Sequence, residues 1–127
     1  MGNYLNSMAI ILLALLFSAN LNSDAPPISV DKYTVVIIEE TETRHHLPKS
    51  QLSAINSSVW RDYVKENNGQ WRVLDQHADT SEDYDWVKQS LEVKRNGLPW
   101  LIFANKERGG SMPLPENLEL LMSEIKQ

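Results

Sequence analysis

Residues 95–103 read Arg-Asn-Gly-Leu-Pro-Trp-Leu-Ile-Phe, and this segment constrains the fold more than any other. Gly97 and Pro99 interrupt a helical pattern, and an apolar run starts directly after them. Because proline has no N–H to donate to a ladder, Pro99 must lie at the first residue of a strand or on an edge. Its tertiary amide makes the cis isomer accessible at about 0.5–1 kcal/mol. The segment therefore predicts a strand that starts at a proline, with the Leu98–Pro99 bond cis.

Three further segments carry strand signals. Residues 33–38 are β-branched and almost wholly apolar, which is typical of a central strand covered by helices on both faces. Residues 71–75 indicate a second strand, and residues 111–112 indicate a short edge strand that Pro113 keeps brief. Together with residues 101–104, these segments predict a mixed sheet of about four strands.

Three helices are predicted around these strands. One continuous helix is expected to end at Asn67-Asn68-Gly69, with Gly69 in a left-handed cap. Its apolar face is formed by Leu52, Ile55, Val59 and Tyr63. Residues 80–83 resemble a capping box that opens a second helix, which ends near Lys94. Pro115 suits the first position of a third helix. The apolar stripe of this last helix is Leu118, Leu121, Met122 and Ile125.

The order β-α-β-α-β-β-α predicts an α/β fold with helices on both faces of a central mixed sheet. The length of 127 residues suits one domain. A net charge of −5 argues against a nucleic-acid partner, which requires a basic patch. The chain has no cysteine, so disulfides, thiolate catalysis and zinc–thiolate sites are excluded. No cofactor is expected.

The N-terminal residues predict a targeting segment. Residues 8–17 are wholly apolar, too short a run for a confident membrane span and typical of the core of a signal peptide. We expect residues 1–25 to form a signal peptide or an N-terminal membrane anchor plus a linker, and residues 26–127 to form the domain. The chain would then be exported, or anchored to the membrane through this segment alone. A buried helix of the domain is the alternative.

The element order and the Gly97-Leu98-Pro99-Trp100 segment resemble the thioredoxin-like superfamily. The chain is also similar to uncharacterised thioredoxin-domain proteins of bacteria and their phages that lack the Cys-x-x-Cys motif. The resemblance implies a thioredoxin-like three-layer sandwich in which residues 43–47 replace the redox loop. Because this loop has no dithiol, thiol–disulfide exchange is impossible. In the family, the backbone beside the cis proline pairs with an extended substrate peptide.

The resemblance therefore implies a peptide or protein partner bound at the backbone of Leu98 beside Pro99. Three side chains of the former redox loop would surround this edge, namely Arg44, His45 and His46. Trp100 would be an aromatic anchor for the partner. Trp100 packed inward under a helix is the equally weighted alternative.

Two other functions stay open. A metal-dependent or acid–base enzyme would use His45 and His46 with an acid such as Glu40 or Asp75, and His77 would supply a third imidazole. Consecutive side chains are expected to diverge, however, and the spacing matches no zinc motif. The second alternative is a structural component of an envelope or virion assembly.

Two acidic patterns also suggest ligands. Asp75, His77 and Asp79 would face one way if the strand continued, but a turn after Asp75 is the stronger expectation. An acidic cluster at the end of the first strand is expected to be a solvated loop rather than a ligand site. Its members are Glu39, Glu40 and Glu42.

Overall fold

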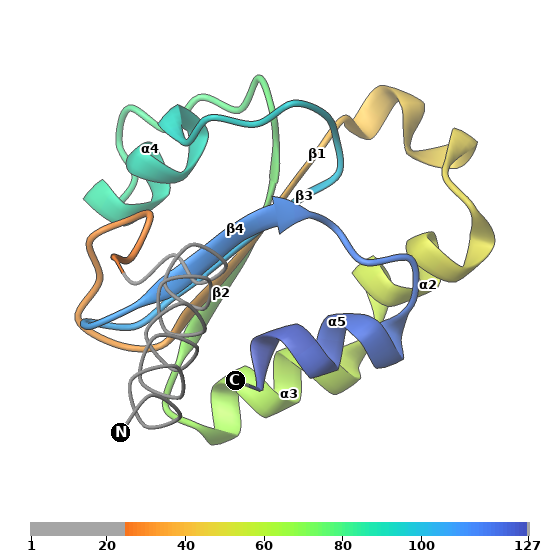
Figure 1. Cartoon of the computed structure of the whole chain (residues 1–127). Helices are drawn as coiled ribbons and strands as arrows, with labels where there is room; N and C mark the ends of the chain where they lie inside the picture. Colours follow the sequence, from red (N-terminus) through yellow and green to blue (C-terminus); the bar gives the residue numbers. More distant parts are fainter. Residues whose placement is uncertain (1–24, 127) are drawn as a thin grey trace, which may run out of the picture.

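A computed structural model describes residues 25–126, which form an α/β fold around one open, mixed, four-stranded sheet (Figure 1). The strand order is β2-β1-β3-β4. The strands are β1 (Thr34–Glu39), β2 (Gln70–Asp75), β3 (Trp100–Ala104) and β4 (Gly109–Pro113). The helices are the 3₁₀ helix η1 (Thr41–His46), α2 (Lys49–Asn56), α3 (Ser58–Glu66), α4 (Asp85–Glu92) and α5 (Leu118–Ile125).

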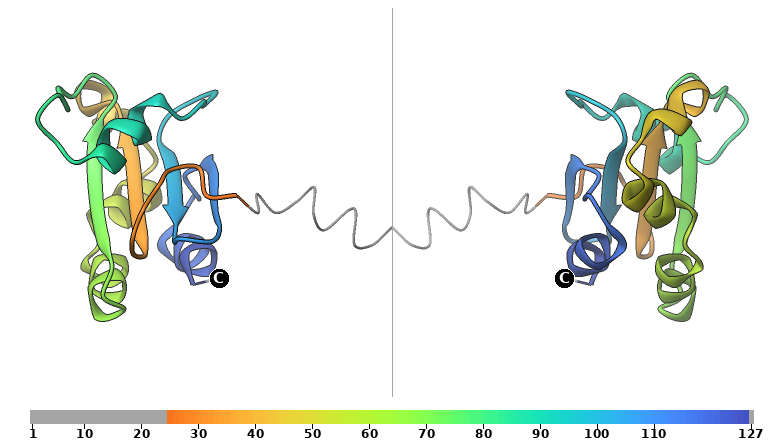
Figure 2. Two further views of the ribbon diagram at one scale, coloured as in Figure 1. Left: turned by 90° about the vertical axis from the view of Figure 1, so that its left-hand side faces the viewer. Right: turned by 90° about the vertical axis from the view of Figure 1, so that its right-hand side faces the viewer.

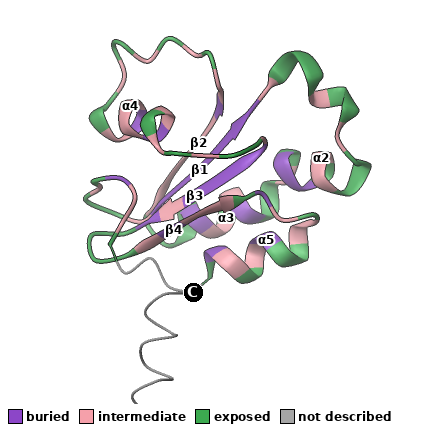
Figure 3. Ribbon diagram, turned by 45° about the horizontal axis from the view of Figure 1, so that its top comes forward, coloured by how far each residue is buried: buried purple, intermediate pink, exposed green. Residues whose placement is uncertain are grey.

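Strand β1 is the central strand that its apolar sequence predicts. It runs parallel to β2, with Thr34 opposite Gln70, and antiparallel to β3, with Ile38 opposite Trp100. Strand β4 pairs antiparallel with β3 and lies at the other edge. All six residues of β1 are buried because helices cover both faces of this part of the sheet (Figure 3).

Helices α2, α3 and α5 cover one face of the sheet (Figure 2). Their buried side chains pack on Val35, Ile37 and Leu101, which alternate with the residues that face the other way. The helix residues in this core are Ala54, Ile55, Trp60, Val64, Leu121 and Ile125. The apolar stripe expected for the last helix is thus confirmed, since its four members either belong to this core or pack against it.

Helix α4 and the segment before β1 cover the opposite face. Val87 of α4 packs with Val36, Ile38 and Ile102 of the sheet. Ile28, six residues before β1, belongs to the same core and is almost fully buried. Residues that precede the first strand therefore contribute apolar area to the folded domain.

The single helix expected to end at residues 67–69 is instead two helices that meet at Ser57. This residue has extended backbone angles and ends α2, and its hydroxyl accepts a hydrogen bond from the Val59 N–H at the start of α3. The break changes which face is buried. Trp60 and Val64 enter the core, whereas Val59 is 51% exposed, so the predicted apolar face was wrong at Val59. Tyr63 packs against the core as expected.

Three further local predictions were wrong. Asn68, with a φ of 58°, adopts the left-handed conformation that was expected of Gly69. Residues 81–82 form a turn, and α4 begins at Asp85 after Tyr84, which makes no side-chain cap. Helix α5 begins at Leu118, three residues after Pro115, because Asn117 caps it by accepting a hydrogen bond from the Leu120 N–H.

Within residues 25–126, no helix combines the length and the apolar character needed to cross a membrane. The predicted signal peptide or anchor lies in residues 1–24, outside the described part of the chain.

Candidate functional site

The carboxyl ends of β1 and β2 meet the start of β3 at one end of the sheet. Glu39 lies opposite Asp75, and Ile38 lies opposite Trp100. Two connecting segments leave this end, namely η1 after β1 and the loop of residues 93–99 before β3 (Figure 1). The structure therefore brings the predicted binding residues of both segments to the same end of the sheet.

Pro99 is buried directly before β3, and the Leu98–Pro99 bond is cis, the isomer expected from the sequence. The Pro99 carbonyl accepts a hydrogen bond of 2.9 Å from the Leu114 N–H. Leu98 is half-buried against the α4 core. Across residues 25–126, nothing hydrogen-bonds to the backbone N–H or C=O of Leu98, so both groups are free to pair with another chain.

An open groove of about 520 Å³ lies beside Leu98. Its walls are Gln76, Val93, Arg95, Gly97 and Leu98. Arg95 is fixed there because its Nη1 donates to the Leu91 and Val93 carbonyls at the end of α4. Gly97 is exposed, and a Cβ built on it meets nothing within 4 Å, so this rim stays open to an approaching backbone.

Arg44 is committed to an ion pair inside the domain. Its Nε donates to Glu39 Oε1 over 2.6 Å, and its Nη2 donates to Glu39 Oε2. The bond to Glu39 raises the pKa of Arg44 above its ordinary value. Glu39 itself is only 1% exposed, so the expectation of a solvated acidic loop was wrong for this residue. Arg44 thus fixes η1 on β1, and only its remaining guanidinium N–H groups are available to a partner.

His45 and His46 are exposed at the end of η1. Their ring centroids lie 4.1 Å apart with the planes tilted by 56°, so the expected divergence of the two side chains was wrong. His77 lies elsewhere, with its Nε2 3.8 Å from Glu40 Oε2. In the part of the chain that the structure describes, no three His, Asp or Glu side chains are placed to hold a metal ion.

Asp75 joins the end of β2 to the start of η1. Its Oδ1 accepts from the Thr41 N–H over 2.8 Å and from the Thr41 hydroxyl over 2.7 Å, and its Oδ2 accepts from the His77 N–H. The bonds from Thr41 and His77 lower the pKa of Asp75 to about 2. Strand β2 ends at Asp75, so Asp75, His77 and Asp79 do not continue as alternating strand residues.

Trp100 packs inward, which is one of the two alternatives that the sequence leaves open. It is 7% exposed in the α4 core, and its indole N–H donates to Ser111 Oγ over 2.7 Å. Trp100 and Ile102 share one core while Leu101 belongs to the other, as side chains alternate along a strand. Trp100 thus belongs to the core against which Leu98 packs.

Sequence reasoning missed Gln76, Val93 and Arg95 as walls of the groove. Arg95 and Gly97 lie within three residues before Leu98 in the sequence, so their presence in the same groove could have been inferred from the position of Leu98. Gln76 was detectable only as the residue that follows a parallel strand, where α/β sheets place ligands.

No protein-family model matches this sequence, and no curated protein matches it.

Proposed function

We propose that this chain is a non-redox, thioredoxin-like binding domain that takes an extended segment of a partner protein along the backbone of Leu98. The strand order β2-β1-β3-β4 and the position of Pro99 directly before β3 support a thioredoxin-like assignment. The absence of cysteine excludes thiol–disulfide exchange.

One observation carries the proposal: a half-buried Leu98 keeps both backbone polar groups unpaired beside an open groove. Each backbone N–H and C=O is a strong hydrogen-bonding group, and those of Leu98 have no partner within the described domain, so they offer a docking point for another backbone. A peptide in extended conformation offers a matching C=O and N–H, as in other cases of strand addition. Binding would complete hydrogen bonds that the free domain leaves to solvent.

The surroundings of Leu98 suit such a peptide. The side chains of Val93 and Leu98 give the groove an apolar part, and Gln76 and Arg95 give it a polar rim. In an extended peptide alternate side chains point the same way, so one would enter the groove and the next would turn outward toward η1. The exposed imidazoles of His45 and His46 are the predicted site side chains that remain free on η1.

The experiment is a selection of linear peptides from a random library against the full chain, followed by affinity measurements on the variant Gly97→Val. Because a Cβ at Gly97 meets no atom within 4 Å and no glycine has a positive φ among the described residues, valine should leave folding intact. Its branched side chain should block the approach of a backbone to Leu98. We expect selected peptides to lose roughly ten-fold or more in affinity, as when a buried hot-spot contact is removed.

Gly97→Ala is the matched control, since a single methyl group on the same open rim should weaken the peptides far less than valine does. A Gly97→Val variant that melts like the parent yet binds the peptides equally well would place their site elsewhere. A library that yields no peptide specific for the folded chain would also contradict the proposal.

A further inference from the structure

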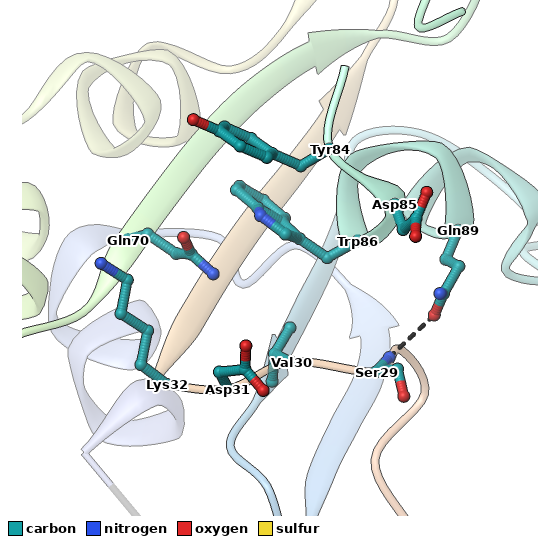
Figure 4. A pocket seen from close by; sticks show the side chains of 9 residues that line it. All are labelled: Ser29, Val30, Asp31, Lys32, Gln70, Tyr84, Asp85, Trp86 and Gln89. Atoms are coloured by element: carbon teal, nitrogen blue, oxygen red, sulfur yellow. Dashed lines mark hydrogen bonds between the residues drawn. The ribbon is translucent and has the colours of Figure 1, made fainter. Parts of the chain in front are cut away.

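A second hollow lies at the opposite end of the sheet from the Leu98 groove. It encloses about 700 Å³ between the segment before β1 and the first turn of α4 (Figure 4). Gln70, which lies opposite Thr34 at the start of β1, closes one side of it. This volume is in the range of about 300–1,000 Å³ that is typical of small-molecule sites.

Two aromatic rings form one wall of this cleft. Tyr84 and Trp86 lie parallel, with an interplanar angle of 7° and ring centroids 6.4 Å apart (Figure 4). Trp86 packs partly against the α4 core, whereas Tyr84 is 73% exposed. The two parallel rings therefore offer flat apolar faces, with Trp86 anchored against the core and Tyr84 open to solvent.

Unpaired polar groups of both kinds surround the aromatic wall. Within residues 25–126, the carboxylates of Asp31 and Asp85 and the ammonium of Lys32 form no hydrogen bond or ion pair. The Trp86 indole N–H also has no partner in this part of the chain. Gln89 accepts from the Ser29 N–H over 2.8 Å through its carbonyl oxygen, which leaves its NH₂ group as a donor.

We propose that this cleft binds a neutral sugar. The C–H face of a pyranose ring is apolar and stacks on a flat aromatic surface, while each hydroxyl both donates and accepts hydrogen bonds. Carboxylates beside an ammonium and an indole N–H match such hydroxyls. An anion would face Asp31 and Asp85, and a cation would face Lys32, so neither charge is selected. This inference does not depend on the proposed peptide site.

The test is an NMR titration of the ¹⁵N-labelled full chain with glucose, galactose, N-acetylglucosamine and their β-linked disaccharides. The indole cross-peak of Trp86 should shift with added sugar because its N–H is free to bind. The indoles of Trp60 and Trp100 are internal controls, since they donate to the Ala54 carbonyl and to Ser111 Oγ inside the domain. Their cross-peaks should stay in place.

Variants separate stacking from hydrogen bonding. Tyr84→Phe keeps the ring and should bind sugar like the parent, whereas Tyr84→Ala should bind roughly three- to ten-fold more weakly. Asp31→Asn with Asp85→Asn should also weaken binding, because the two neutral amides are poorer acceptors for hydroxyl groups. Asp62 is exposed on α3 outside the cleft, so Asp62→Asn should leave the sugar affinity unchanged.

Three results would overturn the proposal. One is a panel in which no sugar shifts the Trp86 cross-peak. Another is a Tyr84→Ala variant that folds and binds sugar like the parent; if that variant does not fold, unchanged binding by the Asp31/Asp85 double variant decides the same question. The third is a larger shift of Trp86 with choline or inorganic phosphate than with any sugar, since charge selection would then govern the site.

Discussion

At the scale of single residues, two carboxylates at the carboxyl end of the sheet hold η1 in place. Glu39 accepts two hydrogen bonds from Arg44, and Asp75 accepts hydrogen bonds from the backbone N–H and the hydroxyl of Thr41. Both acids come from strand ends where a ligand site was one sequence-based interpretation. Their hydrogen bonds are satisfied within the domain, so their role is to position the loop that carries His45 and His46.

The lowered pKa of Asp75 implies that the stability of the domain depends on pH. Its pKa is lowered from 3.8 to about 2, so its contribution to the free energy of unfolding is complete above about pH 4 and is lost as the pH falls through 2. Chemical denaturation of the parent should therefore give a steadily smaller free energy of unfolding from pH 4 to pH 2. Asp75→Asn should be less stable at pH 6 and should show a flatter profile.

Asp62→Asn is the matched control, because Asp62 is exposed and forms no hydrogen bond within residues 25–126. It should keep the parental slope. The Asp75 variant will retain some slope, since the pKa of Asp79 is also lowered by its bonds from Ser81. A profile for Asp75→Asn that superimposes on that of the parent would contradict the role assigned to this carboxylate.

Arg44 is expected to stabilise the fold because its removal leaves the buried carboxylate of Glu39 unpaired. Arg44→Leu leaves the carboxylate of Glu39 without its cation, and we expect the free energy of unfolding to fall by about 3 kcal/mol. A second change, Glu39→Leu, removes the stranded charge and should restore most of the loss. Urea denaturation of both single variants and the double variant gives the coupling free energy between the two side chains. If Arg44→Leu and the double variant lose the same free energy of unfolding, an unpaired buried charge is excluded as the cause.

Few of these residue roles could be predicted from the sequence. The placement of Pro99 before a strand follows from the chemistry of proline. The burial of Glu39 does not, because it depends on a 3₁₀ turn that returns Arg44 to the strand five residues earlier. The orientation of Trp100 required the helix α4 that covers it, since both faces of β3 are apolar in sequence.

At the scale of elements, strands were easier to predict than helix boundaries. The strand order along the chain follows from apolar runs and the turns between them, and each predicted strand exists within one or two residues. The helices were misplaced where a short polar side chain decides the boundary. The Ser57 hydroxyl splits one predicted helix into two, and Asn117 rather than Pro115 opens the last one.

In the β3–β4 hairpin, close packing of Gly109 against Phe103 predicts a loss of stability when Gly109 is replaced. A Cβ on Gly109 would clash with the Phe103 carbonyl oxygen, so Gly109→Ala must displace backbone and should lower the free energy of unfolding by about 1–3 kcal/mol. The same change at Gly97 meets open space and should stay within about 0.5 kcal/mol of the parent. Guanidinium denaturation compares the two variants, and a Gly109→Ala variant as stable as Gly97→Ala would disprove the close contact.

At the scale of the whole molecule, the sheet carries a separate hollow at each end on the α4 side. The Leu98 groove was predictable in part because Leu98 directly precedes Pro99, which marks the start of strand β3. The aromatic cleft was not, because it forms only when the segment before β1 meets a helix more than fifty residues further along the chain. The two proposed activities are therefore separable, and variants in one hollow should leave the other unchanged.

In the proposed complex, the backbone of a partner pairs with the backbone of Leu98. The most direct measurement is the solvent hydrogen exchange of the Leu98 amide in the ¹⁵N-labelled full chain, with and without a selected peptide. The account predicts fast exchange in the free chain and strong protection in the complex, and a peptide N-methylated at the pairing residue should bind weakly and protect little. A tightly bound peptide that leaves the Leu98 amide exchanging at its free rate would contradict the account.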